Sequence, residues 1–245
     1  MKTVLVNQAR MGSTRLPGKV LKPVLGKPLL SYQLERLQRI SSLDDLVIAT
    51  TTHPSDDELQ NYCHQNNVSC FRGSEENVLS RFLQVAEDHN ADVLVRVTAD
   101  CPLIDPDVCE TVIQTFFKKQ SEYDYVSNCL ERSFPRGLDT EVFSVEALKK
   151  AHGLIKEQKH REHVTSYFYQ NPDVFRCFNV ASEKNHSSYR WTVDTKEDFY
   201  VIEEILKNIY PNNPRFSTQD VLRFLETRPD LVTANAHIEQ KKVGE

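Results

Sequence analysis

The sequence of 245 residues predicts an α/β fold with a mainly parallel, mixed sheet flanked by helices. Two observations lead to this class. Short apolar runs rich in β-branched residues alternate with segments of helical period, which is typical of a parallel sheet covered on both faces. The composition, with 39% hydrophobic and 27% charged residues, is that of an ordinary globular protein and shows no linker or repeat. We therefore expect one domain over residues 1–245.

Each expected element follows from a local pattern. The expected strands and extended segments are 3–6, 46–51, 68–71, 92–98, 123–127, 138–143, 174–180 and 190–194. The expected helices are 29–40, 56–65, 78–86, one that Asp105 and Pro106 open, 145–152, 160–169, 196–208 and 217–225. Asn77 and Ser217 are residue types that cap helix starts, and proline is favoured at the first helical position. Helical period alone supports the segment 29–40.

Charge and cysteine usage exclude several classes of protein. The chain has 30 Lys and Arg against 35 Asp and Glu, a net charge of -5, which disfavours nucleic acid as a partner. The six cysteines form no C-x-x-C pair, which argues against a zinc site and a disulfide framework. No apolar run approaches the roughly 20 residues of a membrane span, and no signal peptide is evident. We expect a cytoplasmic protein with no membrane partner.

The strongest functional signal is the basic segment 8–21, which directly follows the first strand. It combines cations, glycines and hydroxyls: Arg10, Arg15, Lys19, Gly12, Gly18, Ser13 and Thr14. In an open α/β sheet, ligands bind beyond the carboxyl ends of strands, and such residues neutralise and contact phosphates. It is not a Walker A loop, since five residues separate Gly12 from Gly18 and Val20 follows Lys19. The segment predicts a triphosphate site; the alternative is a solvated basic loop.

Two aspartates lie at the ends of expected strands. Asp100 precedes Cys101-Pro102, and Asp194 ends the extended segment 190–194. Carboxylates in such places can hold Mg²⁺ on a polyphosphate. A turn role for Asp100, and capping of the next helix by Asp194, are the simpler alternatives. Convergence of the two carboxylates on the basic loop would make a metal site.

Five motifs together resemble a known family. They are QARMGSTRLPGK at 8–19, FRGSEENVL at 71–79, PRGLDTE at 135–141, REHVT at 161–165 and RWTVD at 190–194. The chain resembles the cytidylyltransferases that make CMP-activated acidic sugars, of the acylneuraminate and 3-deoxy-manno-octulosonate type. Within them it is most similar to the branch of spore coat polysaccharide biosynthesis protein F. The resemblance spans about residues 3–205.

The resemblance implies an activity and an architecture. It implies a single Rossmann-like nucleotidyltransferase domain, similar to glycosyltransferase A folds, with an acceptor and dimerisation excursion within about 130–180. The implied reaction is the Mg²⁺-dependent transfer of CMP from CTP to an acidic sugar, or to a small phosphorylated or carboxylated acceptor. Pyrophosphate is released, in the biosynthesis of surface polysaccharide or glycoconjugate. A homodimer is also implied.

The resemblance further implies roles for individual residues. The catalytic residues would be Arg10, Lys19, Asp100 and Asp194, the last two as metal ligands. The nucleotide-binding residues would be Ala9, Arg10, Gly12, Ser13, Arg15, Lys19, Arg72, Gly73, Ser74, Asn77 and Thr98. The acceptor-binding residues would be Arg136, Asp139, Glu141, Arg161, Glu162, His163 and Arg190. The motif begins Asn7-Gln8 where sugar-acid synthetases usually have Ile-Pro, which leaves the acceptor open.

Several alternatives remain open from the residues alone. His163 lies on an expected helix, where a histidine can be structural rather than functional. Asp139 and Glu141 alternate on an extended segment and should face one side, either as general bases or as partners of Arg136. The whole chain could instead be a glycosyltransferase that uses a nucleotide sugar, or a nucleotide-binding protein without turnover.

Overall fold

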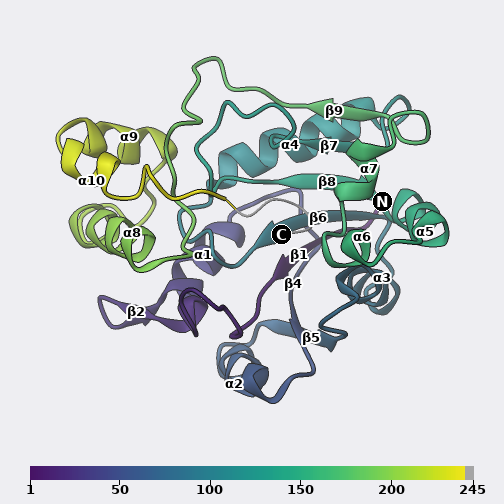
Figure 1. Cartoon of the computed structure of the whole chain (residues 1–245), viewed down its shortest axis with the longest axis horizontal. Helices are drawn as coiled ribbons and strands as arrows, with labels where there is room; N and C mark the ends of the chain where they lie inside the picture. Colours follow the sequence, from purple (N-terminus) through teal and green to yellow (C-terminus); the bar gives the residue numbers. More distant parts are fainter. Residues whose placement is uncertain (241–245) are drawn as a thin grey trace.

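Seven strands form one sheet in the order β5-β4-β1-β6-β8-β7-β9 in the computed structural model, which describes residues 1–240 (Figure 1). The last five residues of the expected 1–245 domain lie outside this range. Strand β8 pairs antiparallel with both neighbours, and all other strand pairs of this sheet are parallel. The predicted fold class, a mainly parallel mixed sheet flanked by helices, is confirmed.

The elements have the following bounds. The strands are β1 (Thr3–Gln8), β4 (Asp45–Thr51), β5 (Ser69–Gly73), β6 (Val93–Thr98), β7 (Tyr125–Ser127), β8 (Glu141–Ser144) and β9 (Cys177–Asn179), with a separate hairpin of β2 (Pro23–Val24) and β3 (Lys27–Pro28). The helices are α1 (Leu29–Leu37), α2 (Asp57–Gln65), α3 (Val78–Asp88), α4 (Pro106–Lys119), α5 (Val145–Leu154), α6 (Gln158–Glu162), α7 (Ser166–Gln170), α8 (Lys196–Ile209), α9 (Thr218–Glu226) and α10 (Pro229–Ala234), with 3₁₀ turns η1 (Lys19–Leu21) and η2 (Pro54–Asp56).

Caps fix where the main helices begin. The Asn77 side chain accepts from the Ser80 N–H, and Asp105 accepts from the Asp107 N–H, so the predicted starts of α3 and α4 are confirmed. Helix α8 is capped by Thr195, which forms a reciprocal capping box with Asp198. The alternative that Asp194 caps this helix is therefore wrong.

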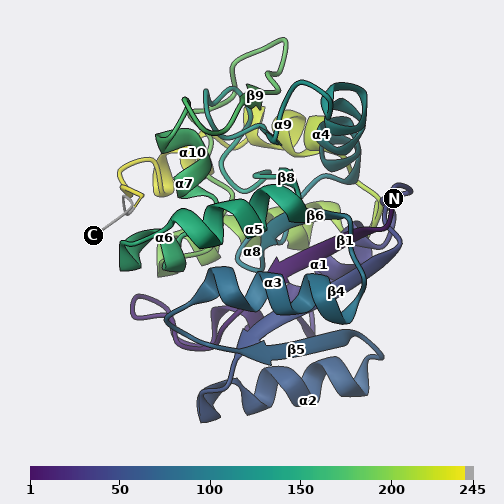
Figure 2. The same cartoon turned by 90° about the vertical axis from the view of Figure 1, so that its right-hand side faces the viewer.

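Alternating side chains cover the sheet with apolar contacts on its two faces. Val4 and Val6 of β1 pack in a core with α3, α5 and α7, whereas Leu5 between them faces a core with α4. Helices α3 and α5 lie side by side on the first face (Figure 2). No helix within residues 1–240 is long and apolar enough to cross a membrane.

Two predicted elements differ in the structure. The helix expected at 160–169 is split into α6 and α7, because Val164 adopts a left-handed backbone (φ 45°) that an α-helix cannot continue through. The segment 190–194 does not join the sheet as a strand and makes only an isolated bridge between Arg190 and Arg136. The predicted excursion at 130–180 contributes strands β8 and β9 to the sheet, together with α5 to α7.

The strand order reverses beside β1. The chain moves from β1 outward to β4 and β5, and then returns to place β6 on the other side of β1. Gln8 at the end of β1 pairs in register with Thr98 at the end of β6. Ligands bind at such a reversal, outside the carboxyl ends of the strands. The basic loop after β1 and Asp100 after β6 both lie at this place.

Gly137 shows how closely the chain passes the 190–194 segment. Its φ is +108°, and a Cβ there would lie 2.7 Å from the Trp191 carbonyl carbon. We expect Gly137→Ala to lower the free energy of unfolding by at least about 2 kcal/mol, from backbone strain and this contact. Gly153→Ala is the matched control, because nothing lies within 4 Å of its Cβ position. Urea unfolding measures both variants, and equal stability of the two would contradict the expectation.

Candidate active site

The loop after β1 is held over the strand ends by one buried carboxylate. Asp56 accepts from the Met11 N–H at 2.7 Å and from the Thr50 hydroxyl at 2.9 Å. Gly18 adopts a left-handed backbone (φ 67°), and its N–H returns to the Met11 carbonyl at 3.0 Å. Burial would raise the pKa of Asp56, but hydrogen bonds from Thr51 and Met11 lower it below its usual value. These contacts tie Met11 of the loop to the end of β4 and close the turn at Gly18.

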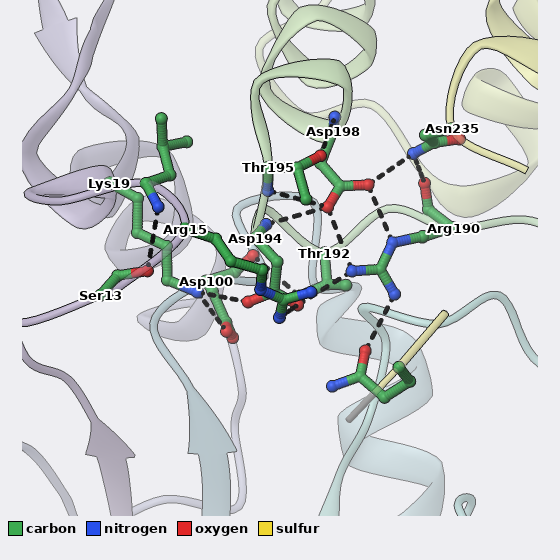
Figure 3. Close-up of polar contacts among 12 residues, drawn as sticks. Ser13, Arg15, Lys19, Asp100, Arg190, Thr192, Asp194, Thr195, Asp198 and Asn235 are labelled. Atoms are coloured by element: carbon green, nitrogen blue, oxygen red, sulfur yellow. Dashed lines mark hydrogen bonds and ion pairs between the residues drawn. The ribbon is translucent and has the colours of Figure 1, made fainter. Parts of the chain in front are cut away.

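Lys19 stands at the centre of the site. Its Nζ lies 2.8 Å from Asp100 Oδ2 and 2.8 Å from Asp194 Oδ1 (Figure 3). Arg15 lies on the other oxygen of Asp194, at 3.1 Å. The two aspartates, expected at the ends of separate segments, thus converge on the basic loop.

Mutual attraction keeps Lys19 and Asp100 charged. Burial would raise the pKa of Asp100, but the Lys19 charge and hydrogen bonds from Lys19 and Thr98 lower it to about 2. Burial would lower the pKa of Lys19, but the two aspartates raise it above its usual value. The Asp100 carboxylate is consequently available as an anion at neutral pH.

Arg190 holds the Asp194 carboxylate through a hydrogen bond. Its guanidinium donates to Asp194 Oδ2 at 2.9 Å and to Asp198 Oδ1 at 2.8 Å, and Asn235 donates to the same Asp198 oxygen (Figure 3). Arg190 is buried and lines neither of the two cavities described below. This place differs from the predicted acceptor contact and makes Arg190 a positioning residue for Asp194.

The donor set at this point is compatible with Mg²⁺. One carboxylate oxygen of Asp100 and one of Asp194 face each other across Lys19 Nζ, which bonds to both. Mg²⁺ is commonly bound through one or two carboxylates, with phosphates and waters completing six ligands. Within residues 1–240, no group of three or more His, Cys, Asp or Glu residues could hold a metal. A metal here would therefore need substrate oxygens as well.

A cavity of about 300 Å³ lies over the loop and the ends of β1, β4 and β6. Among the predicted nucleotide-binding residues, it is lined by Ala9, Arg10, Ser13, Arg15, Lys19 and Thr98. Gly12, Arg72, Gly73, Ser74 and Asn77 do not line it. The Arg72 guanidinium instead points to α2, where it bonds to Asp57 and Gln60.

Sequence reasoning missed several residues of this cavity, four of them near the end of β4 and the start of α3. These four are Thr51, Glu75, Val78 and Arg81. The Asn77 cap was a usable signal, because residues one and four places after a cap lie on the same side of the first helical turn.

A second cavity, of about 420 Å³, adjoins the first and shares Arg96, Thr98, Asp100, His163 and Gln240 with it. Of the predicted acceptor residues, it is lined by Arg136, Asp139, Glu141 and His163, while Glu162 lines the first cavity. Arg161 lines neither and donates to the Ile155 carbonyl. His163 stands where the two cavities meet, and burial lowers its pKa.

Charged pairs occupy much of the second cavity. Asp139 binds the guanidinium of Arg132 through both oxygens, at 2.8 and 2.7 Å. Glu141 binds Arg96 and also accepts from the Tyr125 and Thr165 hydroxyls, each at 2.6 Å. The alternative that these two acids are partners of Arg136 is therefore wrong. The Arg136 side chain has no hydrogen-bond or ion-pair partner among residues 1–240, and burial and the nearby Arg132 lower its pKa.

Comparison with known proteins agrees with this geometry. The family model of the cytidylyltransferases matches residues 4–228. Spore coat polysaccharide biosynthesis protein SpsF of Bacillus subtilis is 36% identical, with 94% of this chain and 96% of that protein covered. A 3-deoxy-manno-octulosonate cytidylyltransferase of Trichlorobacter lovleyi is 34% identical over 47% of this chain and 45% of its own. The solved structure of a cytidylyltransferase from Leptospira borgpetersenii has a TM-score of 0.91 at 33% identity, covering 99% and 100% of the two chains.

The class of protein is thus an enzyme, a nucleotidyltransferase. The strand-order reversal with the cationic loop beside it is the place where a ligand binds in such a sheet. More narrowly, the chain belongs to the cytidylyltransferase family. The expected similarity to the SpsF and 3-deoxy-manno-octulosonate branches is confirmed.

Proposed function

We propose that this enzyme transfers CMP from CTP to a small acidic acceptor and releases pyrophosphate, with Mg²⁺ as its metal. The observation that carries the proposal is the convergence of Lys19, Asp100 and Asp194 at two adjoining cavities. One cavity has a cationic loop for a triphosphate. The other has Arg136, which has no hydrogen-bond or ion-pair partner among residues 1–240, for an acidic acceptor.

Different residues would bind the phosphates, the metal and the acceptor. Arg10, Arg15 and Lys19 would hold the phosphates and stabilise the charge of the departing pyrophosphate. An acceptor oxygen from the second cavity would attack the α-phosphorus in line, and the P–O bond to pyrophosphate would break. Asp100 and Asp194 would hold Mg²⁺, which supplies Lewis-acid neutralisation of the phosphate oxygens when bound. Positioning and electrostatics suffice, so no covalent intermediate on the protein is required.

The decisive measurement is pyrophosphate release from each of the four common nucleoside triphosphates with Mg²⁺, against a panel of acidic sugars and small phosphorylated acids. Release with CTP and one acceptor is the expected result. A glycosyltransferase would instead release a nucleoside diphosphate from a nucleotide sugar, and a non-catalytic protein would bind CTP without release. CTP binding no tighter than that of the other three nucleotides would contradict the cytidylyl assignment.

Arg136 supplies a prediction about the acceptor. Arg136→Gln should raise the KM for the acceptor about 30- to 100-fold and leave the KM for CTP near its normal value, because one charge-assisted contact is lost. Steady-state kinetics with each substrate varied in turn measures the split. An equal rise in both KM values, or none, would contradict an acceptor contact at Arg136.

The biological setting is proposed from the relatives. The name of the Bacillus subtilis relative supports a place in the biosynthesis of surface polysaccharide or glycoconjugate. The homodimer implied by the family resemblance and the cytoplasmic location expected from the sequence stay predictions. Sedimentation of the purified chain tests the dimer.

A further inference from the structure

His163 lines both cavities and has no part in the mechanism above. In an in-line transfer the acceptor oxygen comes from the second cavity and attacks the α-phosphorus in the first. The hydroxyl proton is therefore lost at the boundary between the cavities, and a group that removes it belongs there. The side chains that line both cavities are Arg96, Thr98, Asp100, His163 and Gln240.

Four of these five side chains are poor proton acceptors near neutral pH. Arg96 is a cation held in an ion pair, and the Gln240 amide has no basic nitrogen. The Thr98 hydroxyl donates to Asp100 at 2.6 Å, and the Asp100 carboxylate has a pKa of about 2. The imidazole of His163 is therefore the base of this boundary.

The His163 ring is available to a ligand and is neutral at pH 7. Neither ring nitrogen has a hydrogen-bond or ion-pair partner among residues 1–240. Burial lowers the pKa of His163, Glu162 acts in the opposite direction, and Arg96 and His160 lower it further. A neutral imidazole with a free nitrogen accepts a proton from a hydroxyl within hydrogen-bond reach.

The second cavity presents further charged groups to the imidazole. Its two acids are ion-paired outside the Lys19 site, Asp139 with Arg132 and Glu141 with Arg96. Arg136, which has no hydrogen-bond or ion-pair partner among residues 1–240, adds one positive charge. An unpaired cation in the same cavity opposes protonation of the ring.

A strained backbone holds His163 at this boundary. Val164, the next residue, has a φ of 45°, which is costly for a β-branched side chain. Its side chain is fully buried in the core, and the Thr165 hydroxyl after it donates to Glu141 at 2.6 Å. Packing and this hydrogen bond therefore maintain the turn that ends α6 at the two cavities. Such strain is found mainly at functional sites.

We propose that His163 is the general base of the transfer and takes the proton of the attacking acceptor hydroxyl. This rests on the proposed cytidylyl transfer. As the bond from the acceptor oxygen to the α-phosphorus forms, the O–H proton passes to a free imidazole nitrogen. The bond from the α-phosphorus to pyrophosphate breaks, and its electron pair leaves with pyrophosphate. The imidazolium then gives the proton to water.

Chemical rescue tests this role. Pyrophosphate release is measured with CTP, Mg²⁺ and the acidic acceptor of the panel that gives the highest wild-type rate. His163→Ala should lower kcat about 10²- to 10³-fold and leave the KM for CTP near its normal value, and added imidazole should restore at least about tenfold. His163→Gln should show the same loss without rescue, because its amide fills the space and is not a base. It also covers the case in which His163→Ala does not fold.

His160→Ala is the matched control. His160 lies on the same helix and burial lowers its pKa too, but its Nδ1 bonds to the Ser166 hydroxyl at 2.8 Å and it lines neither cavity. His160→Ala should lower the thermal midpoint, because a buried hydrogen bond and packing are lost. It should keep kcat near the wild-type value and gain nothing from imidazole.

A second measurement needs no acceptor. The ring resonance of His163, identified by its absence in His163→Gln, is titrated by NMR in the wild-type chain. The pKa of His163 should lie below its ordinary value of 6.5. A pKa above 7 would overturn the proposal, because the ring would already carry the proton at neutral pH.

The outcomes separate the two proposals. Undiminished turnover in both His163 variants, or a loss that imidazole does not restore in folded His163→Ala, would overturn the role of His163 and leave the cytidylyl transfer standing. A wild-type chain that binds CTP no tighter than the other nucleotides would overturn the cytidylyl transfer, and the role of His163 in it. Loss and rescue in His163→Ala, with normal turnover in His160→Ala, would support both.

Discussion

Replacing Lys19 with methionine should lower kcat by about 10³-fold, the largest effect we expect from one substitution. Lys19 Nζ is the only atom in the described site that contacts both Asp100 and Asp194, at 2.8 Å each. Without it, two partly buried carboxylates face each other, and a triphosphate loses a cation in the centre of its site. Pyrophosphate release under saturating CTP and Mg²⁺ measures the effect.

The same substitution should change the protonation of the site. The pKa of Asp100 is held at about 2 chiefly by Lys19 acting against burial. Removing the ammonium should raise the pKa of Asp100, so the variant loses at neutral pH part of the stability that ion pairing gives the native site. Lys22→Met, one residue beyond the basic segment, is the control, since Lys22 does not line the nucleotide cavity. Near-normal turnover of Lys19→Met would remove Lys19 from the catalytic machinery.

Asp100→Asn should lower the rate at least about 10²-fold, as the loss of one central electrostatic group often does. The amide keeps the size of the side chain and can still accept from the Thr98 hydroxyl, which lies 2.6 Å from Asp100 Oδ1. It removes the negative charge that would bind Mg²⁺ and that pairs with Lys19. The Mg²⁺ concentration that gives half-maximal rate should rise together with the fall in kcat.

Asp107→Asn provides the comparison for Asp100→Asn. Asp107 is an exposed residue in the first turn of α4 and lines neither the nucleotide nor the acceptor cavity. The Asp107→Asn enzyme should keep the wild-type rate and the wild-type Mg²⁺ requirement. An Asp100→Asn enzyme that turns over like Asp107→Asn would exclude Asp100 from the metal site.

Local patterns made most of the fold predictable. Strand formation and helix capping depend on residues that are close together in the sequence. They could therefore be predicted without tertiary structure for the apolar runs of β1, β4 and β6 and for the caps Asn77, Asp105 and Ser217. The break in the helix at Val164 could not be predicted in this way. The apolar and polar pattern of 160–169 is compatible with one helix, and only the backbone turn at Val164 separates α6 from α7.

The sequence by itself determined the class of site and where its main parts attach. A cationic loop after the first strand and an aspartate after β6 must meet once the strand order reverses beside β1. Only the tertiary structure decided which distant side chains share that site. Asp194 reaches Lys19 from 175 residues away, Arg190 turns to Asp198 rather than to the acceptor cavity, and Arg72 turns to α2 while Arg81 enters the nucleotide cavity. The physical reason is that a strand or a cap is set by neighbours along the chain, whereas the direction of a long charged side chain is set by whichever partners the packed fold brings within reach.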